Sequence, residues 1–321
     1  MAIGGFFELE LPGAGESYHS RALALSSGRA CLRRILECLK PARVWVPFYV
    51  CDAVLPAIVH AGADVEFYPI DEALDPILPS GQPSDRDVVM YVNYFGIKSA
   101  TASRLASSLG IRAVIDDTQA FFQRGYSGSS SFNSARKFFG VPDGGYAYAE
   151  GLHADVSADP PTNVRYDHLV VGVLGDRERA FQLYRESEAC VNDEPQAMSA
   201  LSRRVLAGID YERTRCAREQ NFARLHARLG SKNRLRFASE DAVAPFCYPL
   251  LIGAPVPWDA LWQRELFAPR LWPDVEARAP QSTFPWEREL AARLIPLPVD
   301  QRYGAADMDH VVETLAEVLA W

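Results

Sequence analysis

The chain has 321 residues, of which 48% are hydrophobic and 23% charged, the composition of a soluble globular protein with one large domain or two smaller ones. The formal net charge of −8 argues against a nucleic-acid-binding protein, because such proteins carry an excess of Lys and Arg. No run of 18 apolar residues occurs, so we expect no membrane-spanning helix.

The first half of the chain alternates strand-like and helix-like segments. Apolar residues at helical spacing, with Ser at the start or Gly at the end, predict helices over residues 26–40, 51–62 and 99–110. Short apolar runs predict buried strands over residues 43–47, 64–70, 87–96, 111–117 and 144–150. Strands separated by helices of this length indicate βαβ units and a mainly parallel sheet.

After residue 151 the pattern changes. Helical patterns rich in Arg and Glu cover residues 176–190 and 197–230, and strand-like or extended segments at 235–239, 246–253 and 294–300 alternate with helices at 287–294 and 307–321. We therefore expect a large α/β domain over residues 1–195, followed by a connecting helix and a smaller C-terminal α+β domain over residues 196–321.

Cysteine spacing and the N-terminal segment both suggest a cytoplasmic protein. The six cysteines form no CxxC motif and lie near no histidine at zinc spacing, so we expect reduced thiols in the core and no metal site. The first 15 residues carry no basic stretch and include Glu8 and Glu10, which does not fit a secretory signal. Phosphate-loop, zinc-protease and serine-hydrolase motifs are absent.

Two local features could hold an anion and a polar ring. The sequence LSSGRACLRRIL at residues 25–36 places a Ser-Gly turn at a helix N-terminus, where free N–H groups favour a phosphate; a plain N-cap by Ser26 or Ser27 is the alternative. The sequence AVIDDTQA at residues 113–120 places acids at the carboxyl end of a buried parallel strand, where ligands of open α/β folds bind; a helix cap or a solvated turn is the alternative.

The third feature is a lysine in a chain that rarely uses lysine. Only four of the 33 basic residues are lysines, and Lys137 lies in SARKFFGVPDGG, beside two phenylalanines and seven residues before a Gly-Gly pair. Apolar neighbours would lower the pKa of its amine and make it a nucleophile, and Gly144 and Gly145 would let the backbone pass close to a bound group. The alternative is a surface lysine on a loop.

Taken together, these features match what pyridoxal 5'-phosphate requires. A helix N-terminus would hold the phosphate, Asp116 the ring nitrogen, and Lys137 would form a Schiff base with the aldehyde. The chain also resembles the DegT/DnrJ/StrS family of pyridoxal-phosphate sugar aminotransferases, which have fold type I. The resemblance covers most of residues 20–150 and 294–318. It rests on Asp-x-x-Gln from Asp116 to Gln119, on Lys137 followed at +7 by Gly144, and on the Ser27-Gly28-Arg29 turn.

The resemblance implies roles for individual residues. Lys137 would bond to the cofactor and move a proton, Asp116 would pair with the pyridine nitrogen, and Gln119 would lie near the ring hydroxyl. Gly28 and Arg29 would give backbone N–H groups to the phosphate. The remaining cofactor contacts stay open between two residues each: Ser131 or Ser134 for the phosphate serine, and Cys51 or Tyr49 at the position of the aromatic residue that stacks on the ring.

The resemblance also implies an activity and partners. It predicts a cytoplasmic homodimer that transfers an amino group from an amino acid to a keto sugar, which would be nucleotide-linked, in surface polysaccharide (such as lipopolysaccharide) or secondary-metabolite sugar biosynthesis. The alternative is a family member that binds the cofactor without transamination, in regulation or other chemistry. Arg136 would either hold an anionic group of the substrate or pair with a local acid such as Asp143.

Overall fold

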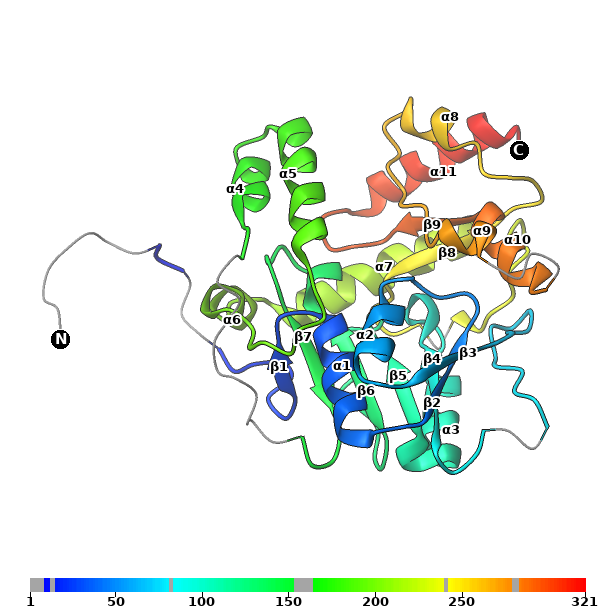
Figure 1. Cartoon of the computed structure of the whole chain (residues 1–321). Coiled ribbons are helices and arrows are strands. Elements are labelled where there is room, and N and C mark those ends of the chain that lie inside the picture. The colour runs from blue at the N-terminus through cyan, green and yellow to red at the C-terminus, as the bar shows by residue number, and fades with distance from the viewer. Residues whose placement is uncertain (1–8, 12–14, 81–82, 153–163, 240–241, 279–282) are drawn as a thin grey trace, which may run out of the picture.

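A computed structural model describes residues 9–11, 15–80, 83–152, 164–239, 242–278 and 283–321. Most of the N-terminal segment considered as a secretory signal, residues 1–8 and 12–14, lies outside the described residues. Figure 1 shows a twisted sheet with helices packed around it, a helical hairpin that rises beside it, and a group of C-terminal elements on the other side. In the described part of the chain, no helix is both long and apolar enough to span a bilayer.

The central sheet has seven strands in the order β1-β7-β6-β5-β4-β2-β3. The strands are β1 (Leu23–Leu25), β2 (Arg43–Pro47), β3 (Asp64–Tyr68), β4 (Asp87–Val92), β5 (Ala113–Asp116), β6 (Ser130–Ser134) and β7 (Gly145–Tyr148). Strands β3, β2, β4, β5 and β6 run parallel to one another, whereas β7 runs antiparallel to both β6 and β1. The sheet is therefore mainly parallel, as the alternating pattern predicts.

Parallel pairing brings the ends of the central strands to one edge of the sheet. Strands β4, β5 and β6 are buried along their whole length and end at Val92, Asp116 and Ser134. Because neighbouring parallel strands end at the same edge, Asp116 and Ser134 lie together there, although 17 residues separate them in the sequence. This edge is where a ligand of an open α/β sheet is expected.

Helices cover the sheet and continue beyond it. They are α1 (Gly28–Leu39), α2 (Val54–His60), α3 (Ser99–Leu109), α4 (Asp167–Val173), α5 (Arg177–Cys190), α6 (Ala200–Ala207), α7 (Tyr211–Leu229), α8 (Trp258–Trp262), α9 (Asp274–Ala277), α10 (Pro285–Arg293) and α11 (Ala305–Leu319), with short 3₁₀ turns η1 (Tyr94–Gly96), η2 (Gly110–Arg112) and η3 (Ala135–Lys137). Helix α1 packs over β6 and β7, and α4 and α5 form the hairpin in Figure 1.

A second, two-stranded sheet lies in the C-terminal part. Strands β8 (Cys247–Leu251) and β9 (Leu294–Pro298) pair antiparallel, and α7 packs against both β8 and α11. The long helix α7 leads from the first sheet to the second, where the sequence places the connecting helix. The division at residue 195 stays a prediction.

Several sequence expectations differ from the structure for clear physical reasons. Strand β6 is missing from the predicted elements because its sequence SSFNS is polar, yet the strand is fully buried in the middle of the sheet. The predicted strand at 235–239 is wrong: this segment forms no strand, and the N–H of Leu235 donates to the side chain of Asn233 at 3.0 Å. The thiols of Cys38 and Cys190 are exposed, so these two do not belong to the core.

Candidate active site

A cavity of about 670 Å³ opens at the carboxyl ends of β5 and β6. Its lining comes from five parts of the chain: the segments that follow these strands, the N-terminus of α1, the start of α2, the α4–α5 hairpin and the C-terminal part. A volume of this size is within the range of pockets that hold cofactors and small substrates. Most residues expected at a functional site lie on its wall.

Asp116 is the buried acid of this cavity. It ends β5, and its Oδ1 accepts a hydrogen bond from the backbone N–H of Thr118 at 2.8 Å. Burial raises the pKa of its carboxyl group, and the positive charge of Lys137 acts in the opposite direction. The neighbouring Asp117 points elsewhere, since its Oδ1 accepts hydrogen bonds from Asn93 and Tyr126 and it does not line the cavity. Of the two neighbouring acids, only Asp116 lines the cavity.

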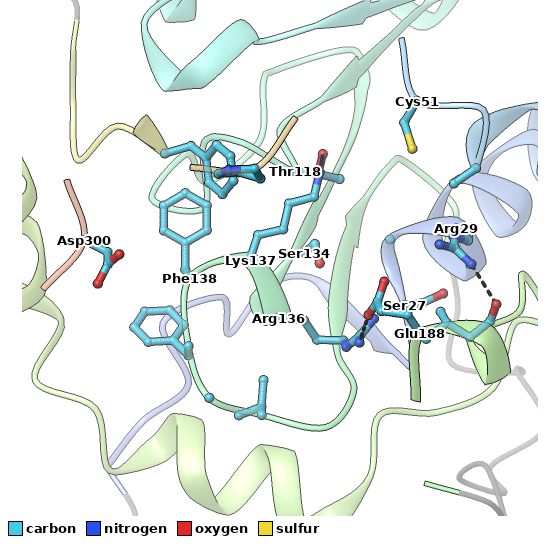
Figure 2. Close-up of a pocket in the computed structure, with 18 of the residues that line it drawn as sticks. Ser27, Arg29, Cys51, Thr118, Ser134, Arg136, Lys137, Phe138, Glu188 and Asp300 are labelled. Atoms are coloured by element: carbon cyan, nitrogen blue, oxygen red, sulfur yellow. Dashed lines mark hydrogen bonds and ion pairs between the residues drawn. The ribbon is translucent and has the colours of Figure 1, made fainter. Parts of the chain in front are cut away.

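Lys137 extends into the cavity from the 3₁₀ turn η3 that follows β6 (Figure 2). Its Nζ donates a hydrogen bond to the Oγ1 of Thr118 at 2.9 Å. The expected burial of this lysine by its two phenylalanine neighbours is not found: Lys137 is exposed, whereas Phe138 and Phe139 are buried in aromatic contacts of their own. The amine is therefore accessible from the cavity.

Strand alternation separates the two candidate serines. Successive side chains of a strand point to opposite faces, so Phe132 and Ser134 of β6 share one face and Ser131 has the other. Phe132 and Ser134 line the cavity, and Ser131, although buried, does not. Ser134, three residues before Lys137, is thus the serine that a ligand in the cavity can contact.

The N-terminus of α1 forms one end of the cavity. Ser27 caps this helix, accepting a hydrogen bond from the N–H of Ala30 at 3.0 Å, so the plain capping interpretation is correct for its hydroxyl. Gly28 and Arg29 follow it on the cavity wall. A Cβ on Gly28 would stand 3.2 Å from the Cγ2 of Thr118, which explains why a glycine lets the first turn of α1 come so near β5.

The Gly-Gly pair has a different role from the one expected. A Cβ on Gly145 would stand 2.7 Å from the backbone carbon of Ser27, and the N–H of Gly144 donates to the carbonyl of Ser26 at 2.7 Å. Neither glycine lines the cavity. The two glycines allow β7 to pass close to the turn before α1. They therefore help to position the N-terminus of this helix and do not themselves face a bound group.

Three further candidates are divided by the structure. Cys51 lines the cavity, whereas Tyr49 does not: it is fully buried behind the wall, where it packs against Tyr94 and against the lining residue Trp272. Gln119 is also buried outside the cavity wall, where its Oε1 accepts the N–H of Phe95 at 2.7 Å. Of these three residues, only Cys51 lies on the cavity wall with the other candidates. Tyr49 and Gln119 are buried behind it.

Arg136 lines the cavity next to Lys137 and pairs with an acid, but not with Asp143. Its guanidinium forms an ion pair with Glu188 of α5. Asp143 is buried and accepts hydrogen bonds from the hydroxyl groups of Ser199 and Ser202 instead. The partner of Arg136 thus comes from 52 residues away.

The far wall consists of residues that sequence reasoning missed. Arg218 of α7 is fully buried, lies 4.3 Å from the ring centre of Phe138, and donates from Nε to Gln301 at 3.0 Å. Burial lowers the pKa of this guanidinium to about 10. Trp272 completes the wall with a backbone φ of 49°, which is uncommon outside glycine. Thr118 was also missed; its position between Asp116 and Gln119 was the one available signal.

No protein-family model matches the chain, and no curated protein is significantly similar to it. Solved structures are similar in fold. The sugar aminotransferase CalS13 from Micromonospora echinospora is 18% identical, with a TM-score of 0.64 over 93% of this chain and 88% of that one. The PLP form of Spr1654 from Streptococcus pneumoniae is 16% identical, with a TM-score of 0.63 over 92% and 86%.

A third structure, DesI in the presence of its TDP-sugar product, is 17% identical, with a TM-score of 0.63 over 93% of this chain and 82% of that one. At these identities the likeness establishes the fold. The chain has the α/β fold of these proteins, which confirms the fold class expected from its sequence.

Proposed function

We propose that this protein is a pyridoxal-phosphate-dependent aminotransferase that moves an amino group from an amino acid to a nucleotide-linked keto sugar. The observation that carries the proposal is that Lys137 and Asp116 line one cavity whose end is the N-terminus of α1. The fold shared with a sugar aminotransferase, with a PLP form and with a TDP-sugar complex supports the same cofactor and substrate class.

The residues of the cavity fit this cofactor. Asp116 offers a buried carboxylate for a protonated ring nitrogen, and Lys137 offers an accessible amine for the aldehyde. The first N–H groups of α1 have no partner within the helix, so those of Gly28 and Arg29 suit a phosphate, together with the hydroxyl of Ser134 on the same wall. Cys51 is on the same wall, and in sequence it has the position of the aromatic residue that stacks on the ring in the family that the sequence resembles.

Pyridoxal phosphate, when bound, supplies a ring that stabilises negative charge on a substrate carbon that has lost a proton. The protein's own groups would direct this chemistry. The carboxylate of Asp116 would hold a proton on the ring nitrogen, because an adjacent negative charge raises the affinity for that proton. Lys137 is the one lysine on the cavity wall in the described ranges, and its Nζ would take and return protons at the reacting carbon.

The direct test begins with the purified protein. It should be yellow, and Lys137→Ala should lose the visible absorbance band together with activity. Glutamate should bleach the band as the amino group is transferred to the cofactor. A wild-type protein with no affinity for pyridoxal phosphate, or a Lys137→Ala variant that keeps both the band and full activity, contradicts the proposal.

A protein that binds the cofactor but is bleached by no amino acid would instead be a cofactor-binding protein without transamination. We also propose that the protein is a cytoplasmic homodimer. Analytical ultracentrifugation of the cofactor-loaded protein tests the dimer, for which a sedimentation coefficient of a 35.6 kDa species would be the contrary result.

A further inference from the structure

We infer that Arg136 is a ligand of the phosphate group of the cofactor, and that the carboxylate of Glu188 occupies its guanidinium until the phosphate replaces it. The inference rests on the proposed function and adds a residue to it. Arg136 immediately precedes Lys137, lines the cavity, and has a side chain that is only 13% exposed. The guanidinium of Arg136 therefore lies in the same cavity as the residues proposed to contact the cofactor.

The position of Glu188 shows at which end of the cavity the guanidinium lies. Helix α5 ends two residues after Glu188, and the chain then passes over the N-terminus of α1. There the carbonyl of Val191 accepts a hydrogen bond from Arg29 at 2.7 Å, and the carbonyl of Asn192 accepts one from the hydroxyl of Ser27 at 3.0 Å. Arg136 therefore reaches toward the helix end proposed for the phosphate.

Figure 2 shows the same arrangement. The side chain of Arg136 points away from the amine of Lys137 and toward Ser27 and Glu188, with Arg29 beyond them. Asp300 lies on the opposite side of the view, past Phe138. Arg136 and Asp300 thus line opposite sides of the cavity, and a guanidinium at the Ser27 end is better placed for the phosphate of the cofactor than for an anionic group of a sugar bound near Asp300.

Charge at this end of the cavity favours a doubly negative group. Two guanidinium groups, those of Arg29 and Arg136, lie near the positive end of α1, and Glu188 is the one acid from the hairpin on the wall. Over the whole wall in the described ranges, five basic residues face three acids: Arg29, Arg136, Lys137, Arg218 and Arg302 against Asp116, Glu188 and Asp300. At the α1 end, the carboxylate of Glu188 balances only one of the two guanidinium charges of Arg29 and Arg136, and a phosphate could neutralise both.

The exchange of Glu188 for a phosphate is physically favourable. A guanidinium binds phosphate through two parallel N–H···O bonds, and the dianion attracts Arg29 and the helix end at the same time. The side chain of Glu188 is 34% exposed, so its carboxylate can return to water at little cost. The ion pair thus shows that Arg136 is positioned to hold an anion, with Glu188 as the intramolecular substitute.

Comparison of pyridoxal phosphate with pyridoxal, which lacks the phosphate, tests this role without measuring activity. Arg136→Gln should weaken binding of pyridoxal phosphate roughly 10- to 100-fold and leave binding of pyridoxal unchanged within about twofold. Arg136→Lys should lie between, because an ammonium keeps the charge and loses the paired geometry. Glu188→Gln should strengthen binding of the phosphate compound about 3- to 10-fold, since its competitor is gone.

Matched variants serve as controls. Arg215→Gln removes a guanidinium that pairs with Glu212 and Glu219 on α7, and Glu186→Gln removes a carboxylate of α5 that pairs with Arg165 outside the cavity. Neither should change the affinity ratio of the two compounds. An unchanged ratio in Arg136→Gln overturns the inference, and so does a variant whose only defect is a raised KM for the sugar substrate. If Arg136→Gln does not fold, an unchanged ratio in Glu188→Gln has the same meaning.

Failure of the inference can be distinguished from failure of the proposed function. If the wild-type protein binds pyridoxal phosphate and the ratio does not depend on Arg136, only the inference fails. If the wild type binds neither compound, the proposed function fails, and inorganic phosphate then tests the anion site alone. Phosphate should raise the Tm of the wild type and not that of Arg136→Gln; equal protection of both proteins would exclude Arg136 as the anion ligand.

Discussion

The amine of Lys137 donates a hydrogen bond to the hydroxyl of Thr118 at 2.9 Å. The two residues come from different strand ends, since Thr118 follows β5 and Lys137 follows β6. Thr118 also lies against Gly28, at the start of α1. One threonine thus connects the proposed nucleophile, the strand that carries Asp116 and the helix end that would hold phosphate.

Thr118→Val should lower kcat by about 3- to 10-fold, because the amine loses the hydrogen bond that orients it. Thr118→Ser keeps the hydroxyl and should stay within about twofold of the wild type. The measurement is kcat with glutamate as the donor and a saturating keto sugar as the acceptor. Equal activity of the valine and serine variants would show that the hydroxyl does not position the lysine.

Asp116→Asn should bind the cofactor but lose activity by roughly 100-fold or more, because a neutral amide no longer favours the protonated ring nitrogen. The visible absorbance of the variant checks binding, and steady-state kinetics check turnover. Asp117→Asn is the control, since Asp117 follows directly in the sequence but does not line the cavity. An Asp116→Asn enzyme with unchanged kcat would remove this residue from the mechanism.

Ser134→Ala should weaken binding of pyridoxal phosphate by about 10-fold, because a hydroxyl facing the cavity can donate to a charged phosphate oxygen. Ser131→Ala makes the same chemical change on the other face of β6 and should leave the affinity unaltered. Equilibrium titration of the apoprotein measures both. The reverse result, a loss only in Ser131→Ala, would mean that the phosphate lies on the opposite side of the strand.

Because His19 is buried in its neutral form, we expect the protein to lose stability in acid. His19 is buried against Phe121 and Tyr146 and makes hydrogen bonds to Tyr148 at 2.6 Å and Asn133 at 3.2 Å. Burial lowers its pKa from 6.5 to about 3. The unfolded chain therefore binds one proton more than the folded protein between these values, so stability falls as the pH falls below 6.5.

From pH 7 to pH 5 this histidine should lower the free energy of unfolding by about 2 kcal/mol. The His19→Gln variant has no such titration, so its free energy of unfolding should change less over the same pH range. Urea denaturation at several pH values measures the difference. Parallel pH profiles of the two proteins would show that His19 is not buried in its neutral form.

Because Asp117 is a buried acid, we expect it to make the stability of the protein depend on pH in the opposite direction. Its Oδ1 accepts hydrogen bonds from Asn93 at 2.9 Å and Tyr126 at 3.0 Å, while its Oδ2 has no partner among the described residues. Burial raises the pKa of this carboxyl group from 3.8 to about 8. Between these values the folded protein binds one proton more than the unfolded chain, so stability falls as the pH rises.

Asp117→Asn should therefore stabilise the protein by about 2 kcal/mol or more at pH 8, and by much less at pH 4. Asparagine has the same shape and carries hydrogen atoms at the position of the unpartnered oxygen. Thermal or urea unfolding at both pH values measures the effect. Equal stabilisation at pH 4 and pH 8 would exclude titration of Asp117 as the cause.

The sequence by itself determined the features that depend on neighbouring residues. The apolar runs of β4 and β5, the serine that caps α1 and the helical spacing after it are local patterns, and they predicted a mainly parallel sheet with its acids at the carboxyl edge. The same patterns singled out Asp116, Lys137 and the Ser27-Gly28 turn, which the fold brings to one cavity.

Only the tertiary structure decided which side chains face that cavity. Strand pairing orients β6 so that Ser134 and not Ser131 faces inward, and the polar sequence of this strand gave no local sign of its burial. The pairing of Arg136 with Glu188 joins residues 52 positions apart, and Trp272 comes from a still more distant segment. Such contacts depend on how elements pack against one another, and packing involves residues that are far apart in the sequence.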